Sequence, residues 1–91
     1  ICQLDCRIHN NLSLKGKRQV LRKVLDRVKA KFNVSIAEVG YNDKWPRYRI
    51  GLCLVGNERR YINSSLDRII NFIDGLGIME ILDSEIEILD C

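Results

Sequence analysis

The fold of this chain is decided by the stretch from Ser13 to Phe32, which reads SLKGKRQVLRKVLDRVKAKF. Its apolar side chains recur every three or four residues, which is the spacing of one face of an α-helix. They are Leu14, Val20, Leu21, Val24, Leu25, Val28 and Phe32. The same stretch holds eight Lys or Arg residues against a single acid, Asp26. The sequence therefore predicts a helix with one buried face and a strongly basic opposite face, with Ser13 as its N-cap.

Length and composition indicate one small globular domain covering residues 1–91. The apolar fraction of 46% is ordinary, and the net charge is only +3. The charges are nevertheless unevenly distributed. Twelve of the fifteen Lys and Arg residues lie at or before Arg49, and every charged residue after Arg68 is an Asp or Glu. We therefore expect a basic region and an acidic region on the folded molecule.

The targeting and cysteine patterns indicate a cytoplasmic protein without a metal site or cofactor. No apolar run approaches the roughly 18 residues of a membrane span, and the start at Ile1 lacks a signal-peptide pattern, although residues before Ile1 can be missing. The four cysteines, Cys2, Cys6, Cys53 and Cys91, show no C-x-x-C spacing. We expect them to be free thiols in a reducing cytosol.

Four strands and a second helix surround the basic helix. Alternating apolar residues predict a half-buried strand over residues 1–8 and another over 47–55. Residues 34–41 also predict a strand, but its register is ambiguous because apolar residues occur at both parities. Asn57 is a candidate cap for a second helix with the stripe Ile62, Leu66, Ile69, Ile70 and Ile73, which ends at Gly75 and Gly77. The last strand, about 79–89, is expected to place Leu82, Ser84, Ile86 and Ile88 inward.

This order of elements predicts an α+β fold with ferredoxin-like βαββαβ topology. Each helix has one apolar stripe, so both helices must cover the same face of the sheet. Right-handed crossovers then give a four-stranded antiparallel sheet with strand order 4-1-3-2. The uncovered face is expected to change from acidic (Asp83, Glu85, Glu87) through mixed (Gln3, Asp5, Arg7) to basic (Arg47, Arg49).

The basic face of the first helix is the candidate nucleic-acid-binding surface. At 100° per residue, Lys15, Arg18, Arg22 and Lys29 fall within about 60° of one another, with Asp26 beside them. Lys23 and Arg27 occupy the adjoining flank. Such a stripe suits a phosphate backbone. The alternative is a solvated face on which Asp26 pairs with Arg22 and Lys29.

The uncovered sheet face is a weaker candidate. RNA-recognition motifs share this topology and stack bases on aromatic residues of the two central strands, but the outward positions here hold no aromatic residue. Arg47 and Arg49, with Trp45 in the preceding turn, could form a partner-binding site. Alternatively, Arg7, Arg47 and Arg49 pair with Asp5, Glu85 and Glu87 across strands, and Trp45 covers the end of the core.

We expect no enzymatic activity. His9 is a lone histidine at the end of the first predicted strand, and there is no P-loop, dinucleotide fingerprint, nucleophile elbow or metal-ligand spacing. The loop 10–17 lacks the glycine-rich run of acylphosphatases, which share the predicted fold. No catalytic residue is therefore assigned.

Several segments together resemble a known family. They are SLKGKR at 13–18, FNVSIAEV at 32–39, the turn at Trp45 and EIEIL at 85–89. In combination they are similar to the YlxP-like family of small bacterial proteins over essentially the whole chain. This resemblance implies a ferredoxin-like fold and no established catalytic residue. It also implies genes that lie beside those of translation initiation and of ribosome-binding factor A, and hence a role in ribosome maturation.

The leading hypothesis is a module that contacts RNA or an assembling ribosomal particle through the basic helix, by charge and shape without base readout. The competing hypothesis is a homodimeric protein-interaction domain, because the edge strands are open and the charge is asymmetric. A regulatory fold of the ACT type is supported by topology alone.

Overall fold

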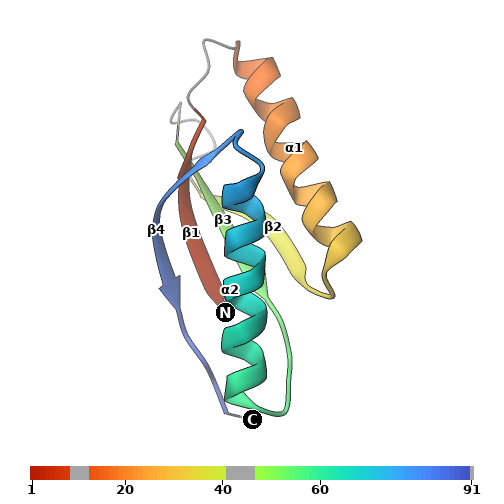
Figure 1. The fold of residues 1–91 in the computed structure, drawn as a ribbon. Coiled ribbons are helices and arrows are strands. Elements are labelled where there is room, and N and C mark those ends of the chain that lie inside the picture. The colour runs from red at the N-terminus through yellow and green to blue at the C-terminus, as the bar shows by residue number, and fades with distance from the viewer. Residues whose placement is uncertain (9–12, 41–46, 91) are drawn as a thin grey trace.

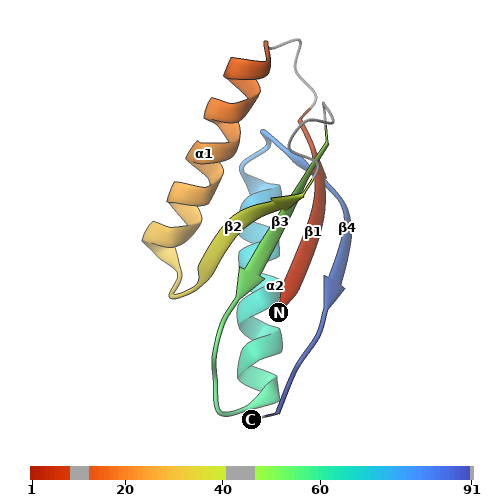
Figure 2. The same ribbon diagram turned by 180° about the vertical axis from the view of Figure 1, so that it is seen from behind.

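The computed structural model describes residues 1–8, 13–40 and 47–90, and these form six elements. In chain order they are β1 (Cys2–Arg7), α1 (Leu14–Lys31), β2 (Ser35–Gly40), β3 (Arg47–Cys53), α2 (Arg59–Gly75) and β4 (Glu80–Ile86). The strands form one sheet in the order β2-β3-β1-β4, with every neighbouring pair antiparallel. Both helices lie on one face of it (Figure 1), and the view from behind shows the other face uncovered (Figure 2). The predicted ferredoxin-like topology and strand order are confirmed.

The core lies between the sheet and the two helices. Cys2, Leu4 and Cys6 alternate along β1 and are fully buried. In the register they stand opposite Leu52, Ile50 and Tyr48 of β3, which are also buried. Since directly paired residues on neighbouring strands share a face, the two central strands together supply the floor of the core, as their alternation predicts.

Helix α1 begins and ends where its sequence predicts. The Ser13 side chain accepts a hydrogen bond from the backbone N–H of Gly16 at 3.1 Å, so Ser13 is the N-cap. Leu21, Val24 and Val28 are buried against the sheet. At the C-terminal end, the Phe32 ring packs edge-on against Phe72 of α2 with 5.5 Å between ring centroids. This aromatic pair joins the two helices.

Helix α2 starts one residue later than expected. Asn57 is not its N-cap; that position is held by Glu58, whose side chain makes no capping hydrogen bond. The Glu58 carbonyl accepts the first helical bond from the Ile62 N–H at 3.1 Å, which places Asn57 outside the helix. The predicted apolar stripe is confirmed by the burial of Leu66, Ile69 and Ile73. Gly77 follows the helix with φ of 70°, a conformation that favours glycine.

Two irregularities correct the predicted strand faces. In β4 the register shifts opposite Asp5 and Cys6, so Ile81 stands opposite buried Cys6 and Leu82 is exposed. Leu82 was expected to point inward, and that prediction is wrong because the extra residue reverses the parity. In β2 a shift at Val39 resolves the ambiguous register, because Ile36 and Glu38 stand opposite Leu52 and Ile50 and so share the helix-covered face.

Within the described residues, neither helix is long and apolar enough to cross a membrane.

Candidate nucleic-acid interface

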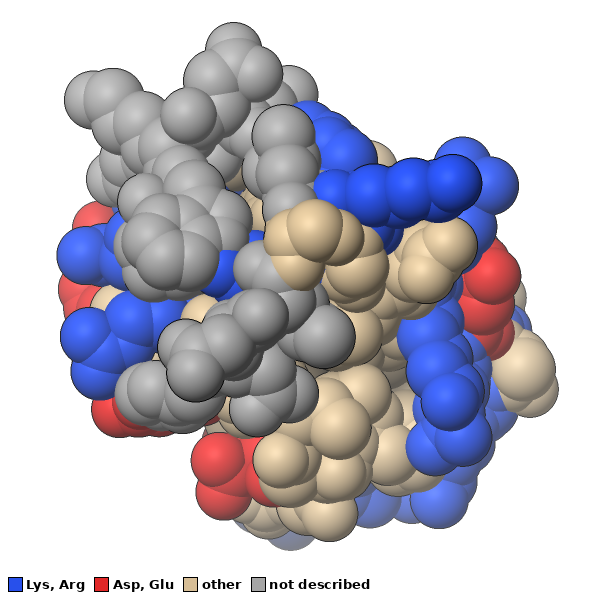
Figure 3. Space-filling view, turned by 90° about the horizontal axis from the view of Figure 1, so that it is seen from above, with Lys and Arg blue, Asp and Glu red and all other residues tan. Residues whose placement is uncertain are grey.

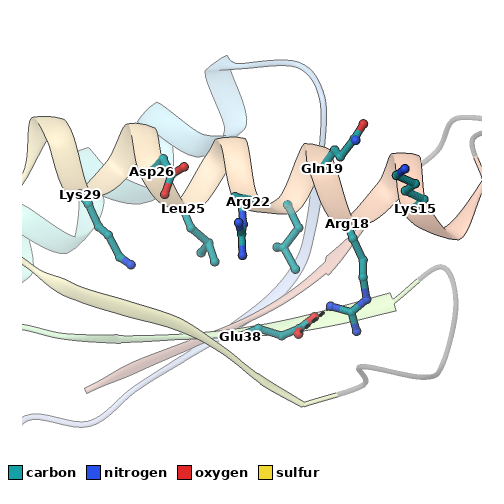
Figure 4. Close-up of a pocket in the computed structure, with 9 residues that line it drawn as sticks. Lys15, Arg18, Gln19, Arg22, Leu25, Asp26, Lys29 and Glu38 are labelled. Carbon is teal, nitrogen blue, oxygen red and sulfur yellow. Dashed lines mark hydrogen bonds and ion pairs between the residues drawn. The ribbon is translucent and has the colours of Figure 1, made fainter.

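A groove of about 740 Å³ runs between α1 and β2 (Figure 4). It is lined by Lys15, Arg18, Gln19, Leu21, Arg22, Leu25, Asp26, Lys29 and Glu38. The lining includes all four residues, Lys15, Arg18, Arg22 and Lys29, that helical spacing placed on one face. Their gathering along one groove follows from α1 burying its opposite face on the sheet.

The groove has an apolar floor and a basic rim. Leu21 is buried and Leu25 is half-buried. Arg22, Leu25 and Lys29 extend from α1 toward β2, whereas Gln19 points away (Figure 4). Because these side chains occupy successive turns of a regular helix, their spacing is fixed by the backbone. The groove therefore offers a fixed row of charges above an apolar surface.

Glu38 is the acid of the groove that sequence analysis missed. Arg18 donates to its Oε1 at 3.4 Å, and the side chain of Glu38 is only 15% exposed while that of Arg18 is 45% exposed. The second carboxylate oxygen, Oε2, is buried and has no hydrogen-bond donor among the described residues. The register of β2 establishes this position, and the signal for it in the sequence was the parity that Glu38 shares with Ile36.

The other cations of the groove, Lys15, Arg22 and Lys29, are exposed. Among the described residues, no ion pair joins Asp26 to Arg22 or Lys29, which the solvated-face interpretation expected. Lys15, Arg22 and Lys29 likewise have no acidic partner in this part of the chain. Their charge is therefore available to an anionic ligand.

The two flanking cations lie outside the groove. Lys23 and Arg27 are exposed on α1 but do not line it. The view from above shows Lys and Arg gathered on the side where α1 lies, with some acidic atoms among them, whereas the side of β4 mixes Lys and Arg with acids more evenly (Figure 3). Lys and Arg thus gather on the α1 side as predicted, but this view shows no purely acidic region, and Lys23 and Arg27 lie on α1 outside the groove.

Lys17 is a second residue that sequence analysis did not place. It is 0% exposed, although it belongs to the cationic run of α1. Lys17 lies one helical turn before Leu21, so it continues the buried stripe of Leu21, Val24 and Val28. This helical spacing could be read from the sequence. Burial lowers the pKa of Lys17 below its ordinary value. Lys17 is therefore unavailable to a surface ligand.

The open face of the sheet pairs its charges internally. Arg49 donates to the Gln3 side chain, to Asp5 at 3.0 Å and to Glu85 at 3.1 Å. Arg7 lies 3.3 Å from Glu80 rather than from the expected Asp5, Glu85 or Glu87. The cross-strand interpretation is therefore confirmed for Arg49 and corrected for Arg7.

The proposed partner-binding trio is only partly described. Arg47 is exposed and stands opposite Arg7 in the sheet. Arg49 donates to Gln3, Asp5 and Glu85. Trp45 lies outside the described residues, as does His9. The described outward positions of β1 and β3 hold no aromatic residue, so the structure adds no support for base stacking on this face.

The described cysteines occupy the two faces that their parity predicts. Cys2 and Cys6 are free and buried, and Cys53 is free and exposed. Burial, helped by the nearby negative charge of Asp5, raises the pKa of Cys6 to about 12. Among residues 1–8, 13–40 and 47–90, no three His, Cys, Asp or Glu side chains cluster as metal ligands. The groove is thus the most developed candidate site.

Comparison with known proteins places this arrangement in a family. A family model described as "Protein of unknown function (DUF503)" matches residues 1–86. The chain belongs to that family. It is also 42% identical over 78 residues to a protein of Bacillus subtilis (strain 168) named "Uncharacterized protein YlxP". The aligned region covers 86% of this chain and 85% of that protein. The resemblance to the YlxP-like family is confirmed, and neither description assigns an activity.

Proposed function

We propose that this protein is a non-enzymatic, cytoplasmic module that binds RNA within an assembling ribosomal particle, using the groove between α1 and β2. The observation that carries the proposal is the row of exposed cations, Lys15, Arg22 and Lys29, without an acidic partner among the described residues. The gene neighbourhood implied by the YlxP-like resemblance supports the ribosomal setting.

The spacing of these cations suits a phosphate backbone. At 1.5 Å per residue, the helix places Arg22 about 10 Å and Lys15 about 21 Å from Lys29 along its axis. A rigid row of this length can neutralise several consecutive phosphates and release their counterions. Arg18 adds a fourth cation, although it also contacts Glu38 at 3.4 Å. The proposal therefore assigns the phosphate contacts to Lys15, Arg18, Arg22 and Lys29, with Lys23 and Arg27 adding to the surrounding field.

A salt titration of binding to purified ribosomal RNA or ribosomal subunits tests this function. With three to four phosphates neutralised, log affinity should fall linearly with log salt, with a slope of about −2 to −3. Fluorescence anisotropy of a labelled RNA fragment measures this directly. Absence of binding at low salt, or binding that does not respond to salt, would contradict the proposal.

A homodimer is the second candidate, and one observation favours it. β2 is an edge strand of the sheet, and its residue Val39 is 54% exposed, with its side chain beside Gly51. An unpaired edge with an exposed apolar residue can pair with a second copy of itself. Light scattering at high protein concentration decides this point, since a dimer mass supports the second candidate and a monomer mass removes it.

A further inference from the structure

We infer that the groove takes single-stranded RNA rather than a duplex, with one base edge placed at Glu38. This inference rests on the proposed function and adds to it the kind of RNA and a residue that reads it. It departs from the expectation of binding by charge and shape alone, because that expectation considered only α1. The groove has a second wall, β2, which carries Glu38.

The groove is suited to an unpaired strand. Its volume of about 740 Å³ is that of a site for small organic groups. A duplex is a wide, rigid cylinder with phosphates outside and bases hidden in pairs. It could reach the exposed ends of Lys15 and Lys29, but it would leave Leu25 and Glu38 without contact. A single strand can place its phosphates on the cations and turn a base into the groove.

The apolar floor gives such a base somewhere to lie. Leu25 is half-buried and extends toward β2 between Arg22 and Lys29 (Figure 4). A base or ribose that covers it removes apolar surface from water, whereas a phosphate group gains nothing there. The alternation of cation and Leu along this wall therefore matches the alternation of phosphate and base along one strand.

Glu38 carries the strongest part of the argument. A carboxylate among cations repels phosphate, so a site for backbone alone would be better without it. Its Oε1 already accepts from Arg18, and its buried Oε2 has no donor among the described residues. A buried acceptor without a donor is costly and rare in a native protein. The Glu38 side chain is 15% exposed, so rotation of its carboxylate can present an oxygen to the groove, where the exocyclic amino group of a base donates to it as cytosine N4 donates to carboxylates.

Two matched oligonucleotides test the inference on the native protein. Oligocytidine and oligouridine of about twelve residues carry the same phosphates and are both unpaired, but only cytidine carries an amino group at position 4. We expect oligocytidine to bind about 3- to 10-fold more tightly, because one additional charged hydrogen bond is made. Oligocytidine dimethylated at N4, which lacks these N–H donors, should bind like oligouridine. A mixed-sequence duplex of the same length should bind about 10-fold or more weakly than oligocytidine at equal salt.

Glu38→Gln identifies the residue responsible. The ratio of the two affinities should fall close to one, because an amide oxygen is a weaker acceptor and its NH₂ group tolerates the uridine carbonyl. Glu80→Gln is the matched control, since Glu80 pairs with Arg7 at 3.3 Å on the far side of the sheet. It should leave the ratio unchanged. The comparison of native protein with dimethylated oligocytidine needs no variant and stands even if Glu38→Gln folds poorly.

Each failure has its own meaning. Duplex binding as tight as single-strand binding, or a cytidine preference that dimethylation does not reduce, would overturn the inference and leave the proposed function intact. Lack of binding by every RNA at low salt would overturn both. Equally tight binding of a polyglutamate peptide would identify an acidic protein segment as the occupant instead.

Discussion

Arg49 on the open sheet face and Arg22 in the groove are both cations on regular secondary structure, yet they lie in opposite surroundings. Arg49 has a side chain that is 22% exposed and contacts Gln3, Asp5 and Glu85. Arg22 is exposed and has no acidic partner among the described residues. The first arginine joins three strands of the protein to one another. The second keeps its charge exposed to solvent.

The difference shows that the register of neighbouring elements, not the number of cations, decides what a basic surface does. In the sheet, Asp5 stands directly opposite Arg49, and Glu85 lies on the next strand at a neighbouring position. Cross-strand neighbours lie about 5 Å apart, so opposite charges there must meet. Among the described residues, two acids line the groove against four cations: Glu38 pairs with Arg18, and Asp26 forms no ion pair with Arg22 or Lys29. The excess of cations there is therefore uncompensated.

The largest expected effect comes from reversing the groove charges. Replacing Arg18, Arg22 and Lys29 together by Glu should weaken RNA binding by about 100-fold or more, because three attractive contacts become repulsive. Co-sedimentation with ribosomal particles and fluorescence anisotropy both measure this loss. The domain should remain folded because all three side chains are exposed, but its free energy of unfolding should fall, since Arg18→Glu removes the donor to the largely buried Glu38.

A second triple variant provides the control for net charge. Arg59, Arg60 and Arg68 are exposed on α2, and replacing them by Glu changes the net charge by the same amount. If this variant loses RNA binding as fully as the groove variant does, the effect is one of overall charge and the groove is not the site. Retained co-sedimentation of the groove variant would also remove the assigned mechanism.

The next effect concerns the open face and should appear in stability instead of binding. Arg49→Ala should lower the free energy of unfolding by about 1–2 kcal/mol, because it leaves the largely buried carboxylate of Asp5 without its donor. The side chain of Asp5 is only 16% exposed. Urea denaturation measures the change, and affinity for RNA should stay the same.

Arg7→Ala is the comparison for that variant. Arg7 and Glu80 are each 43% exposed, so their pair is screened by water and should contribute less than about 1 kcal/mol. Equal destabilisation by the two variants would show that the contacts of Arg49 do not act as a network. Loss of RNA binding by Arg49→Ala would show that the two faces are not separate.

The fold was accessible from the sequence because its signals are repeated along each element. The apolar stripes of α1 and α2 and the alternation of β1 and β3 each involve several residues, so one exception does not change the assignment. The grouping of Lys15, Arg18, Arg22 and Lys29 followed from helical geometry in the same way. These features depend on local periodicity alone.

What the sequence did not reveal depends on neighbours across the sheet. The irregularities in β2 and β4 reverse parity, and nothing within either strand marks the reversal. The inward position of Glu38, the exposure of Leu82 and the pairing of Arg7 with Glu80 all follow from those registers. Lys17 was missed for a different reason, because its charge hid its place on the apolar stripe.

The smallest effect offers the finest test of the groove itself. Arg22 and Lys23 are adjacent, exposed and equally charged, but only Arg22 lines the groove. Arg22→Ala should weaken RNA binding about 3- to 10-fold and make the salt slope shallower by about 0.7, the contribution of one phosphate on a single strand. Lys23→Ala should change affinity by about twofold or less, because a flanking cation acts only through the screened field. Both variants alter net charge by the same amount on the same turn of α1, so any difference between them reports position alone. Equal losses would assign binding to the whole basic side of α1, and a larger loss for Lys23→Ala would move the site to its outer flank.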